Sequence, residues 1–585
     1  MNGNPGATKS GYNRFLLLVA GLGGLLYGVD VGIIAGALPY LEATSGLNAG
    51  QLSFIVAAVL LGSVISTLFA GMLADWMGRK KLMTLSGVLF VISIPTIALA
   101  HGYWPLVLGR LLRGVSAGLI GVVIPLYLAE CLDASSRGKG TGIFQWLLTF
   151  GIFAATIIGL YFSHRVDEVA KLGDADKLFA FKDTAWRGIF WVSFPPGILF
   201  VIGSFMVTES PRWLFRRGKI DAARAALLCS RTDEQAEVEL AEMKETAAEK
   251  AKTSTGEKIR ESLLHRKYVI PFLLACIILA CNQLTGINSI IGYNATILIQ
   301  AGLSDLHAHF ANALFTLINF LVTIGGVMLV DRKGRKFLLS LGSAGIVVSL
   351  LCAGILFHKT EKLRVDVKDA VQAMVATNQT LALAFNETVM THLTGRVLPS
   401  SLVVIYSYGG FHGATTAICS DDQTAKPVEI TRENCVPPNK VVAFFSNPFA
   451  DLDAARAAPL KIENALITPV PGEQNGWLTA VCLFVFMSFF AVGPGVCVWL
   501  ALSELMPTRI RSNGMSIALL INQAVSTTIA AIFLPTVGKY GYSTMFFAFA
   551  GCTVIYFVTA ACFLPETKGK TLEEIEEHFE GVKKT

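Results

Sequence analysis

The sequence predicts an all-α membrane protein with twelve transmembrane helices, and three observations lead to that prediction. Of the 585 residues, 53% are apolar and only 15% are charged, against about a quarter charged in soluble domains. The mean hydropathy is +0.57. The apolar residues gather in runs of the length, about 20 residues, that spans a bilayer as a helix. This composition excludes a soluble globular enzyme and a disordered chain.

The apolar runs number twelve, six before a charged central stretch and six after it. Backbone polar groups must be paired inside lipid, so runs this long and continuous are expected to be helices. The first six lie at roughly 14–38, 52–74, 82–101, 104–129, 141–163 and 187–207. The second six lie at roughly 268–298, 308–330, 336–357, 476–502, 513–537 and 542–564.

The distribution of Lys and Arg among the short loops predicts the orientation. Basic residues occupy every short loop that follows an even-numbered span, at 79–81, 137–139, 332–336 and 509–511. The short odd-numbered loops, such as 39–51 and 101–104, contain no Lys or Arg. Basic loops stay on the cytoplasmic side. We therefore expect both termini in the cytoplasm and the protein in the plasma membrane.

Two long polar segments divide the chain into parts. Residues 208–267 are rich in Glu, Lys and Arg and are expected to form a cytoplasmic linker of amphipathic helices. Residues 358–475 form a large exoplasmic insert, in which Cys419 and Cys435 are candidates for a disulfide. The expected organisation is an N-terminal half (1–207), the linker, a C-terminal half with the insert (268–564), and a cytoplasmic tail (565–585).

An internal repeat relates the two halves. The segment ADWMGRKK at 74–81 recurs as VDRKGRKF at 330–337, 256 residues later. Glu130 and Arg137 recur as Glu504 and Arg511, 374 residues later. The offset grows by 118 residues, which is the length of the insert 358–475, so the first half does without the insert. Two parallel six-helix halves form the major facilitator arrangement, with substrate bound between them near the membrane midplane. We expect the insert to be dispensable for this core.

The repeated motifs have a mechanical interpretation. Asp-x-x-Gly-Arg-Lys predicts a tight turn in which glycine permits close backbone packing. Its charges can pair with acidic and basic side chains at neighbouring helix ends, and such pairs form in one conformation and break in another. The alternative is that the basic loops only hold the topology. The candidate cytoplasmic gate comprises Asp75, Arg79, Glu130, Arg137, Glu209, Asp331, Arg335, Glu504 and Arg511.

Further motifs resemble the sugar porter family of the major facilitator superfamily. They are GRKK after span 2, PLYLAE at the end of span 4, TESPRWL after span 6, NQLTGIN in span 7, GPGVCVW in span 10 and PETKG after span 12. The resemblance covers nearly the whole chain outside the insert. It implies a carrier of hexoses, pentoses or polyols such as inositol. Departures are Thr208 in place of Pro, Asn282 in place of Gln, and the extra cation Arg113 in span 4.

Span 7 supplies neutral hydrogen-bonding groups that suit a sugar. Asn282, Gln283, Thr285, Asn288 and Ser289 interrupt an apolar run, and 282, 285 and 289 are expected to share one helical face. Gly286 and Gly292 are expected to interrupt the helix, as in other transporter sites. Amides within a membrane helix either serve function or join helices by hydrogen bonds, and both interpretations stand.

The resemblance implies the other members of the site. Positions that correspond to the family's sugar contacts are Gln145, Gln283, Asn288, Asn319, Trp499 and Asn522. Tyr293 is expected to be a contact or a gate, and Gly493-Pro494-Gly495 is expected to break span 10 just before Trp499. The full candidate substrate site is Gln145, Asn282, Gln283, Asn288, Tyr293, Asn319, Trp499 and Asn522.

Asp30 is the only charged residue in the run LLYGVDVGIIAGAL (25–38) of span 1. A carboxylate near the bilayer centre costs about 2.5–3.5 kcal/mol even on mild scales. We expect Asp30 to pair with Arg110 of span 4 and to bind the coupling proton, and a static buried salt bridge is the alternative. Glu130 lies 20 residues beyond Arg110, about 30 Å along a helix, and so belongs to the opposite end. The resemblance implies proton coupling, because proton-coupled sugar porters carry an acid at this position.

These observations predict a proton symporter for a monosaccharide or polyol that works by alternating access. A facilitative uniporter and a nutrient sensor of the same fold are alternatives, and the short tail 565–585 argues against the sensor. The sequence contains no metal motif, no nucleophile with a base and no G-x-x-x-x-G-K-[ST] loop, so neither an enzyme nor ATP drive is expected. The expected partners are sugar or polyol, proton and lipid bilayer. We expect a monomer without cofactor, bound metal or nucleic acid.

Overall fold

The computed structural model describes most of the chain. The described residues are 5–132, 134–241, 243–244, 265–395, 400–418, 428–437, 440, 443, 450–469, 471–506, 510–567, 575 and 578–579. Within these ranges the side chains of 5–10, 49, 129, 134–142, 331, 414, 416, 418, 428, 499–504, 511–513 and 516 are outside the description. The side chains of Arg137, Asp331, Trp499, Glu504 and Arg511 therefore lie outside the described residues, and Cys419 does too.

Twelve helical segments in the described ranges are long and apolar enough to cross a membrane, which confirms the predicted number. The N-terminal half contains α1 (Pro5–Ser45), α2 (Ala49–Met77), α3 (Arg79–Ala98), α4 (Tyr103–Cys131), α5 (Ala134–Ala170), α6 (Ala175–Trp191) and α7 (Phe194–Met206). The C-terminal half contains α11 (Arg266–Leu284), α12 (Ile287–Gln300), α13 (Asp305–Lys333), α14 (Arg335–Glu361), α19 (Glu473–Val492), α20 (Pro494–Leu505), α21 (Arg511–Tyr540), α22 (Tyr542–Val558) and the π-helical turn η2 (Thr559–Phe563).

Three of the twelve spans are made of two helices each. The break between α11 and α12 falls at Gly286, whose φ of +81° favours glycine. A Cβ there would lie 2.4 Å from the ring of Phe549. The expectation that Gly292 also interrupts this span is wrong, because Gly292 lies inside α12 with only ordinary contacts around it. Gly493 separates α19 from α20, where Pro494 lacks the amide that would continue the helix. The third pair is α6 and α7.

The insert folds as a small α/β unit, a feature that the sequence analysis left open. Its main antiparallel sheet has the order β1-β6-β3-β4, and β2 pairs with β5 in a second sheet. The strands are β1 (Val365–Asp366), β2 (Leu381–Leu383), β3 (Ser400–Tyr408), β4 (Phe411–Ile418), β5 (Val428–Ile430) and β6 (Leu460–Pro469). The helices are α15 (Lys368–Ala373), α16 (Glu387–Thr394), α18 (Leu452–Ala457) and the 3₁₀ turn η1 (Arg432–Asn434). Strand residues such as Leu402, Val404 and Ile462 form its own apolar core.

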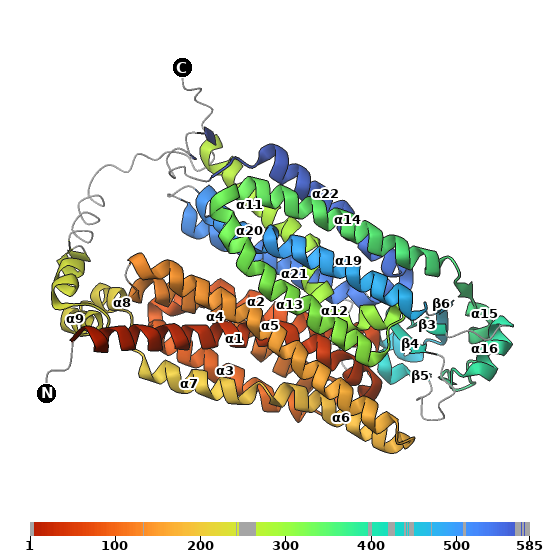
Figure 1. Cartoon of the computed structure of the whole chain (residues 1–585). Coiled ribbons are helices and arrows are strands. Elements are labelled where there is room, and N and C mark those ends of the chain that lie inside the picture. The colour runs from red at the N-terminus through yellow and green to blue at the C-terminus, as the bar shows by residue number, and fades with distance from the viewer. Residues whose placement is uncertain are drawn as a thin grey trace.

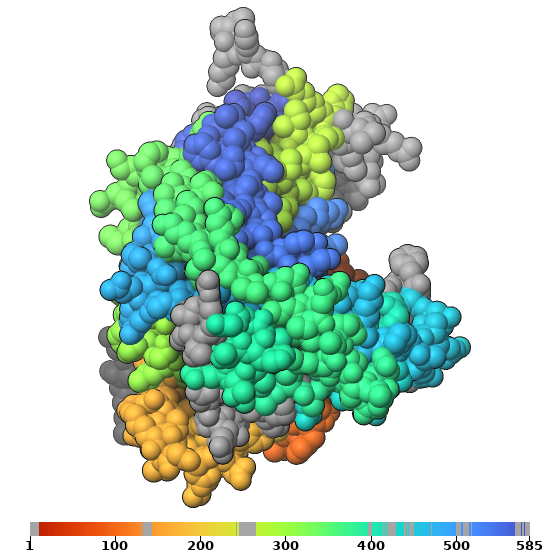
Figure 2. All heavy atoms as spheres, turned by 90° about the vertical axis from the view of Figure 1, so that its right-hand side faces the viewer, coloured from red at the N-terminus to blue at the C-terminus, as the bar shows by residue number. Residues whose placement is uncertain are grey.

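The insert lies at one end of the bundle, which we call the insert end (Figure 1). Viewed from this side, it extends across much of the bundle (Figure 2). The opposite end, which we call the motif end, holds the turns at Gly78 and Gly334. The linker helices α8 (Pro211–Arg216) and α9 (Ile220–Leu228) lie there as well (Figure 1).

The apolar cores differ between the two ends. At the insert end, one cluster of buried residues contains members of both halves, including Ile33 and Leu38 of α1 and Ile290 and Ile297 of α12. At the motif end, the described residues give each half its own cluster. One, around Phe200, lies within the N-terminal half, and the other lies within the C-terminal half and the tail. The halves are therefore joined by apolar packing at the insert end.

Candidate functional site

Three amide side chains meet where span 7 breaks and packs against α21. Gln283 Nε2 donates to Asn522 Oδ1 at 3.2 Å, and Asn288 Nδ2 donates to Gln283 Oε1 at 2.9 Å. Asn288 Nδ2 also donates to Ser526 Oγ at 2.8 Å, while Asn522 Nδ2 donates to the Leu279 carbonyl at 3.0 Å. The result is a preformed network of neutral donors and acceptors, here called the amide cluster (Gln283, Asn288, Asn522 and Ser526). Hydroxyl groups of a ligand can exchange into such a network.

The left-handed turn at Gly286 brings the amide cluster together. Gln283 lies in the last turn of α11 and Asn288 in the first turn of α12, so that residues five apart in sequence face each other. The expected single face of residues 282, 285 and 289 is wrong, because the helix ends at Leu284 and no continuous face exists. Asn282 is buried with its Oδ1 unpartnered, and Thr285 donates to the Asn282 carbonyl at 2.7 Å.

Two of the other predicted sugar contacts, Asn319 and Gln145, have described side chains. Asn319 of α13 is nearly buried, and Gln145 of α5 is half-buried. The ring centroids of their chain neighbours Trp146 and Phe320 are 5.6 Å apart, so Gln145 and Asn319 belong to facing stretches of the two halves. No contact between either residue and the amide cluster is described. The side chain of Trp499 lies outside the described residues.

Tyr293 lies on α12, ten residues after Gln283 in the direction of the insert end. It is fully buried, its ring stacks on Phe533 with centroids 4.6 Å apart, and its hydroxyl donates to the Ala530 carbonyl at 3.3 Å. Both contacts are to α21, so Tyr293 packs α12 against α21. In this conformation Tyr293 is a buried packing residue rather than an exposed contact.

A second polar centre lies inside the N-terminal half. Asp30 Oδ1 is 2.6 Å from Arg113 Nε and 3.8 Å from Arg110 Nη1, and all three side chains are buried. Arg110 was the expected partner, but Arg113 makes the shorter contact. Arg113 also stands 4.6 Å over the Phe90 ring, and Arg110 Nε donates to the Ile55 carbonyl at 3.3 Å. One carboxylate therefore faces two buried guanidinium groups.

At the motif end of the N-terminal half, charges lock the turn at Gly78. Arg79 contacts Glu130 and Asp75, each at 2.9 Å. The Glu209 carboxylate accepts the backbone N–H groups of Arg79 at 2.9 Å and Lys80 at 3.1 Å, which caps the start of α3. A hydrogen bond from Ser210 to Glu130 completes this group, here called the N clamp.

The C-terminal half repeats part of this arrangement. Glu566 accepts the backbone N–H groups of Arg335 at 3.0 Å and Lys336 at 3.2 Å, beside a Gly334 with φ of +90°. We call this group the C clamp. The sequence analysis missed Glu566, although TESPR and PETKG each place a Glu after the last span of a half. The side chains of Arg137, Asp331, Glu504 and Arg511, which were predicted to join the gate, lie outside the described residues.

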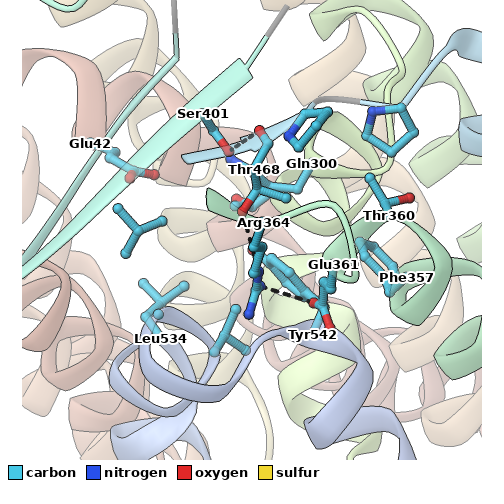
Figure 3. A pocket seen from close by; sticks show the side chains of 16 residues that line it. Glu42, Gln300, Phe357, Thr360, Glu361, Arg364, Ser401, Thr468, Leu534 and Tyr542 are labelled. Atoms are coloured by element: carbon cyan, nitrogen blue, oxygen red, sulfur yellow. Dashed lines mark hydrogen bonds and ion pairs between the residues drawn. The ribbon is translucent and has the colours of Figure 1, made fainter. Parts of the chain in front are cut away.

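A cavity of about 80 Å³, lined in part by polar and charged side chains, lies at the insert end, where the insert meets both halves. Arg364 bridges Glu361 at 3.2 Å and Thr468 Oγ1 at 3.2 Å, which fixes β6 of the insert to the end of α14 (Figure 3). Glu42 of α1 lines the same cavity from the N-terminal half (Figure 3). Asn48, the N-cap of α2, donates to the Asn434 carbonyl of the insert at 2.5 Å. The insert therefore contacts both halves.

Twelve spans in two halves, with a neutral polar cluster beside their junction and separate charge clusters at one end, define a major facilitator transporter. The family model described as "Sugar (and other) transporter" matches residues 16–393 and 463–579. The chain belongs to this sugar transporter family and is a transporter rather than an enzyme. The unmatched stretch 394–462 falls within the insert.

Individual relatives extend over nearly the whole chain. The glucose transporter GlcP of Staphylococcus epidermidis is 27% identical over 570 residues, which cover 96% of this chain and 97% of that protein. The human proton myo-inositol cotransporter is 27% identical over 566 residues, or 96% of this chain and 80% of that protein. The fold matches the partially occluded inward-open conformation of the xylose transporter XylE from E. coli, with a TM-score of 0.65 and 20% identity. That match covers 96% of this chain and 100% of the other.

Proposed function

We propose that this protein is a proton symporter for a monosaccharide or a polyol, working by alternating access in the plasma membrane. The amide cluster supports the substrate class, because neutral amides and a hydroxyl match the donors and acceptors of a sugar. Two relatives carry glucose and myo-inositol in their names, and one of these names includes the proton. We assign sugar binding to the amide cluster, with Gln145, Asn319 and Trp499 completing the site.

The motif end faces the cytoplasm in this proposal. The basic residues of the even-numbered loops gather there, as the preference of Lys and Arg for the cytoplasmic side requires. Apolar packing joins the halves at the insert end, so the conformation described here is closed to the outside. The N and C clamps each hold one half rigid while the two halves move against each other.

The observation that carries proton coupling is the buried contact of Asp30 with two arginines. An ionised Asp30 is stabilised by both guanidinium groups. Protonation removes this attraction and leaves Arg113 and Arg110 facing a neutral acid in a region of low dielectric, where the two cations repel each other. The resulting change in the packing of α1 against α4 reaches α12, because α1 packs on α12. Asn288 lies on α12, so proton and sugar binding are linked reciprocally.

The test is Asp30→Asn, which mimics the protonated acid. We expect this variant to exchange sugar across the membrane, yet to lose both accumulation against a gradient and the response of uptake to an inward proton gradient. Uphill uptake and equilibrium exchange are measured on the same proteoliposomes. Asp183→Asn is the matched control, because Asp183 bonds Arg187 within α6 at a partly exposed site and should leave both properties intact.

Accumulation by Asp30→Asn with the parent's dependence on pH would refute the coupling role of Asp30. The protein would then be a facilitative uniporter with a static ion pair in its N-terminal half. A substrate panel of hexoses, pentoses and inositol, competed against each other in the same vesicles, identifies the sugar.

A further inference from the structure

A polar seam joins the two halves near the insert end, outside the sites described so far. It runs between α13 of the C-terminal half and α5 and α1 of the N-terminal half. Thr316 of α13 and Thr156 of α5 share a hydrogen bond of 2.7 Å. Nearer the insert, Asp305 and His309 of α13 face the same two helices of the N-terminal half. These contacts cross between halves, so they must separate when the transporter opens toward the insert side.

Asp305 ties the halves together directly. Its Oδ2 accepts hydrogen bonds from the Tyr40 hydroxyl of α1 and from Ser163 Oγ of α5, both at 2.8 Å. Tyr40 and Ser163 are buried, while the Asp305 side chain keeps 38% of its surface exposed. One carboxylate at the edge of the seam therefore accepts two hydrogen bonds from the opposite half.

His309 lies deeper in the seam, one turn along α13. Its side chain is 0% exposed, and its ring stacks on Tyr40 with centroids 5.7 Å apart. Space for the ring comes from the close crossing of α1 and α5, where a Cβ on Gly36 would lie 2.9 Å from the Cα of Gly159. Both ring nitrogens lack a hydrogen-bond partner, and Nε2 is 3.7 Å from Asp305 Oδ1, too far for a hydrogen bond.

This environment suits the neutral imidazole. Among the described residues, the titratable groups that face His309 are Asp305 on its own helix and Tyr40 on α1. On the α5 side lie Gly159 and Ser163, which carry no charge. On the α19 side, Glu473 is paired with His307 at 2.7 Å. An imidazolium in the closed seam would be buried without a hydrogen bond, and the partly exposed Asp305 already accepts two other bonds. Burial of such a charge is costly.

We propose that His309 is a second proton site, which is neutral in the closed seam and takes a proton from the outside solution when the seam opens. A proton on His309 then opposes closure, so that acid medium holds the transporter open on the insert side. Because a proton on Asp30 promotes transport and a proton on His309 delays it, uptake falls again at acid pH. Histidine ordinarily titrates near pH 6.5. This inference rests on the proposed sugar transport, since sugar exchange is its readout.

The experiment measures equilibrium exchange of the transported sugar in proteoliposomes, with the same pH on both sides, from pH 7.5 to pH 5. His309→Gln and His309→Phe both remove the titration, and Phe retains the stacking on Tyr40. We expect each variant to match the parent at pH 7.5 and to exchange several-fold faster than the parent at pH 5, where the parent's imidazole is charged while the seam is open. His307→Gln is the matched control on the same helix and should keep the parent's loss of exchange at acid pH.

Identical pH profiles of exchange for the parent and both His309 variants would overturn the proposal. A His307→Gln variant that no longer loses exchange at acid pH would also overturn it. A distance measurement on the otherwise unaltered protein supplies an independent test. Spin labels on genetically encoded ketone residues at Ala43 of α1 and Phe310 of α13, both exposed, should show a longer distance at pH 5 than at pH 7.5. An unchanged distance would also refute the proposal. Neither readout uses sugar accumulation. A negative result for His309 therefore leaves the proposed role of Asp30 untouched, and a negative result for Asp30 leaves the proposed role of His309 untouched.

Discussion

The two ends of the helix bundle are held together in different ways. At the insert end, a single apolar core crosses between the halves, and hydrogen bonds such as Asp305 to Tyr40 cross with it. At the motif end, each half has its own apolar core, and the described charge contacts of Arg79 and Glu566 stay within one half. In the described conformation, apolar packing therefore joins the halves at one end.

This difference separates contacts that contribute to folding stability from contacts that contribute to the equilibrium between conformations. In the proposed transport cycle, we expect the clamps within a half to contribute to the stability of that half in every conformation. We expect the contacts between halves to exist only while the insert end is closed, and so to set the equilibrium between closed and open. Breaking each kind of contact should therefore give a different result, and the following experiments separate the two.

The largest effect is expected at the N clamp. Arg79→Ala leaves the buried Glu130 without its closest cation, which costs about 3–5 kcal/mol of folding stability. Arg335→Ala at the C clamp is the matched comparison. It leaves the backbone N–H groups that donate to Glu566 in place and removes the hydrogen bond from Arg335 Nη1 to the Val330 carbonyl at 3.3 Å, so its loss should be about 1 kcal/mol. Unfolding in mixed micelles measures both. Equal losses would show that the two halves are clamped alike, and a shift in conformation without loss of stability would show that the N clamp is a gate.

An intermediate effect is expected at the amide cluster, between the two ends. Gln283→Ala and Asn288→Ala should each weaken sugar binding about fivefold to tenfold, since each removes hydrogen bonds worth about 1 kcal/mol. Asn294→Ala is the control in the same helix, because Asn294 bonds Asn312 at 2.8 Å and not the cluster. That variant should lose stability while keeping its affinity. Unchanged affinity in both cluster variants, measured by tryptophan fluorescence titration or radioligand binding, would place the sugar elsewhere.

The smallest effect is expected where the insert contacts the N-terminal half. Asn48→Asp keeps an N-cap for α2 but removes the N–H donor to Asn434, so closure of the insert end should weaken by about 1 kcal/mol. The spin-label pair at Ala43 and Phe310 measures this as a few-fold larger open population. Asn48→Ser, which also caps helices and lacks the amide donor, should behave in the same way. An open population that stays constant in both variants would show that the insert does not hold the ends closed.

Replacement of residues 365–471, most of the insert, by a short flexible linker tests whether the insert holds its end of the bundle closed. The repeat predicts that the core still inserts and carries sugar without it. The contacts of Asn48 and the cavity around Glu42 add the expectation that the shortened protein favours the open insert end. A folded deletion variant that carries no sugar at all would contradict the predicted independence of the core.

The sequence alone determined the twelve spans, the duplicated halves and the helix breaks at Gly286 and Gly493, because chain length, hydropathy and backbone chemistry act locally. It also identified Asp30 as a buried charge. It did not reveal Glu566 as a cap, Arg113 as the nearer partner of Asp30, or His309 in the seam. Each of these depends on which helices lie side by side and at what rotation. Close packing of distant segments sets those contacts, and spacing along the chain does not record them.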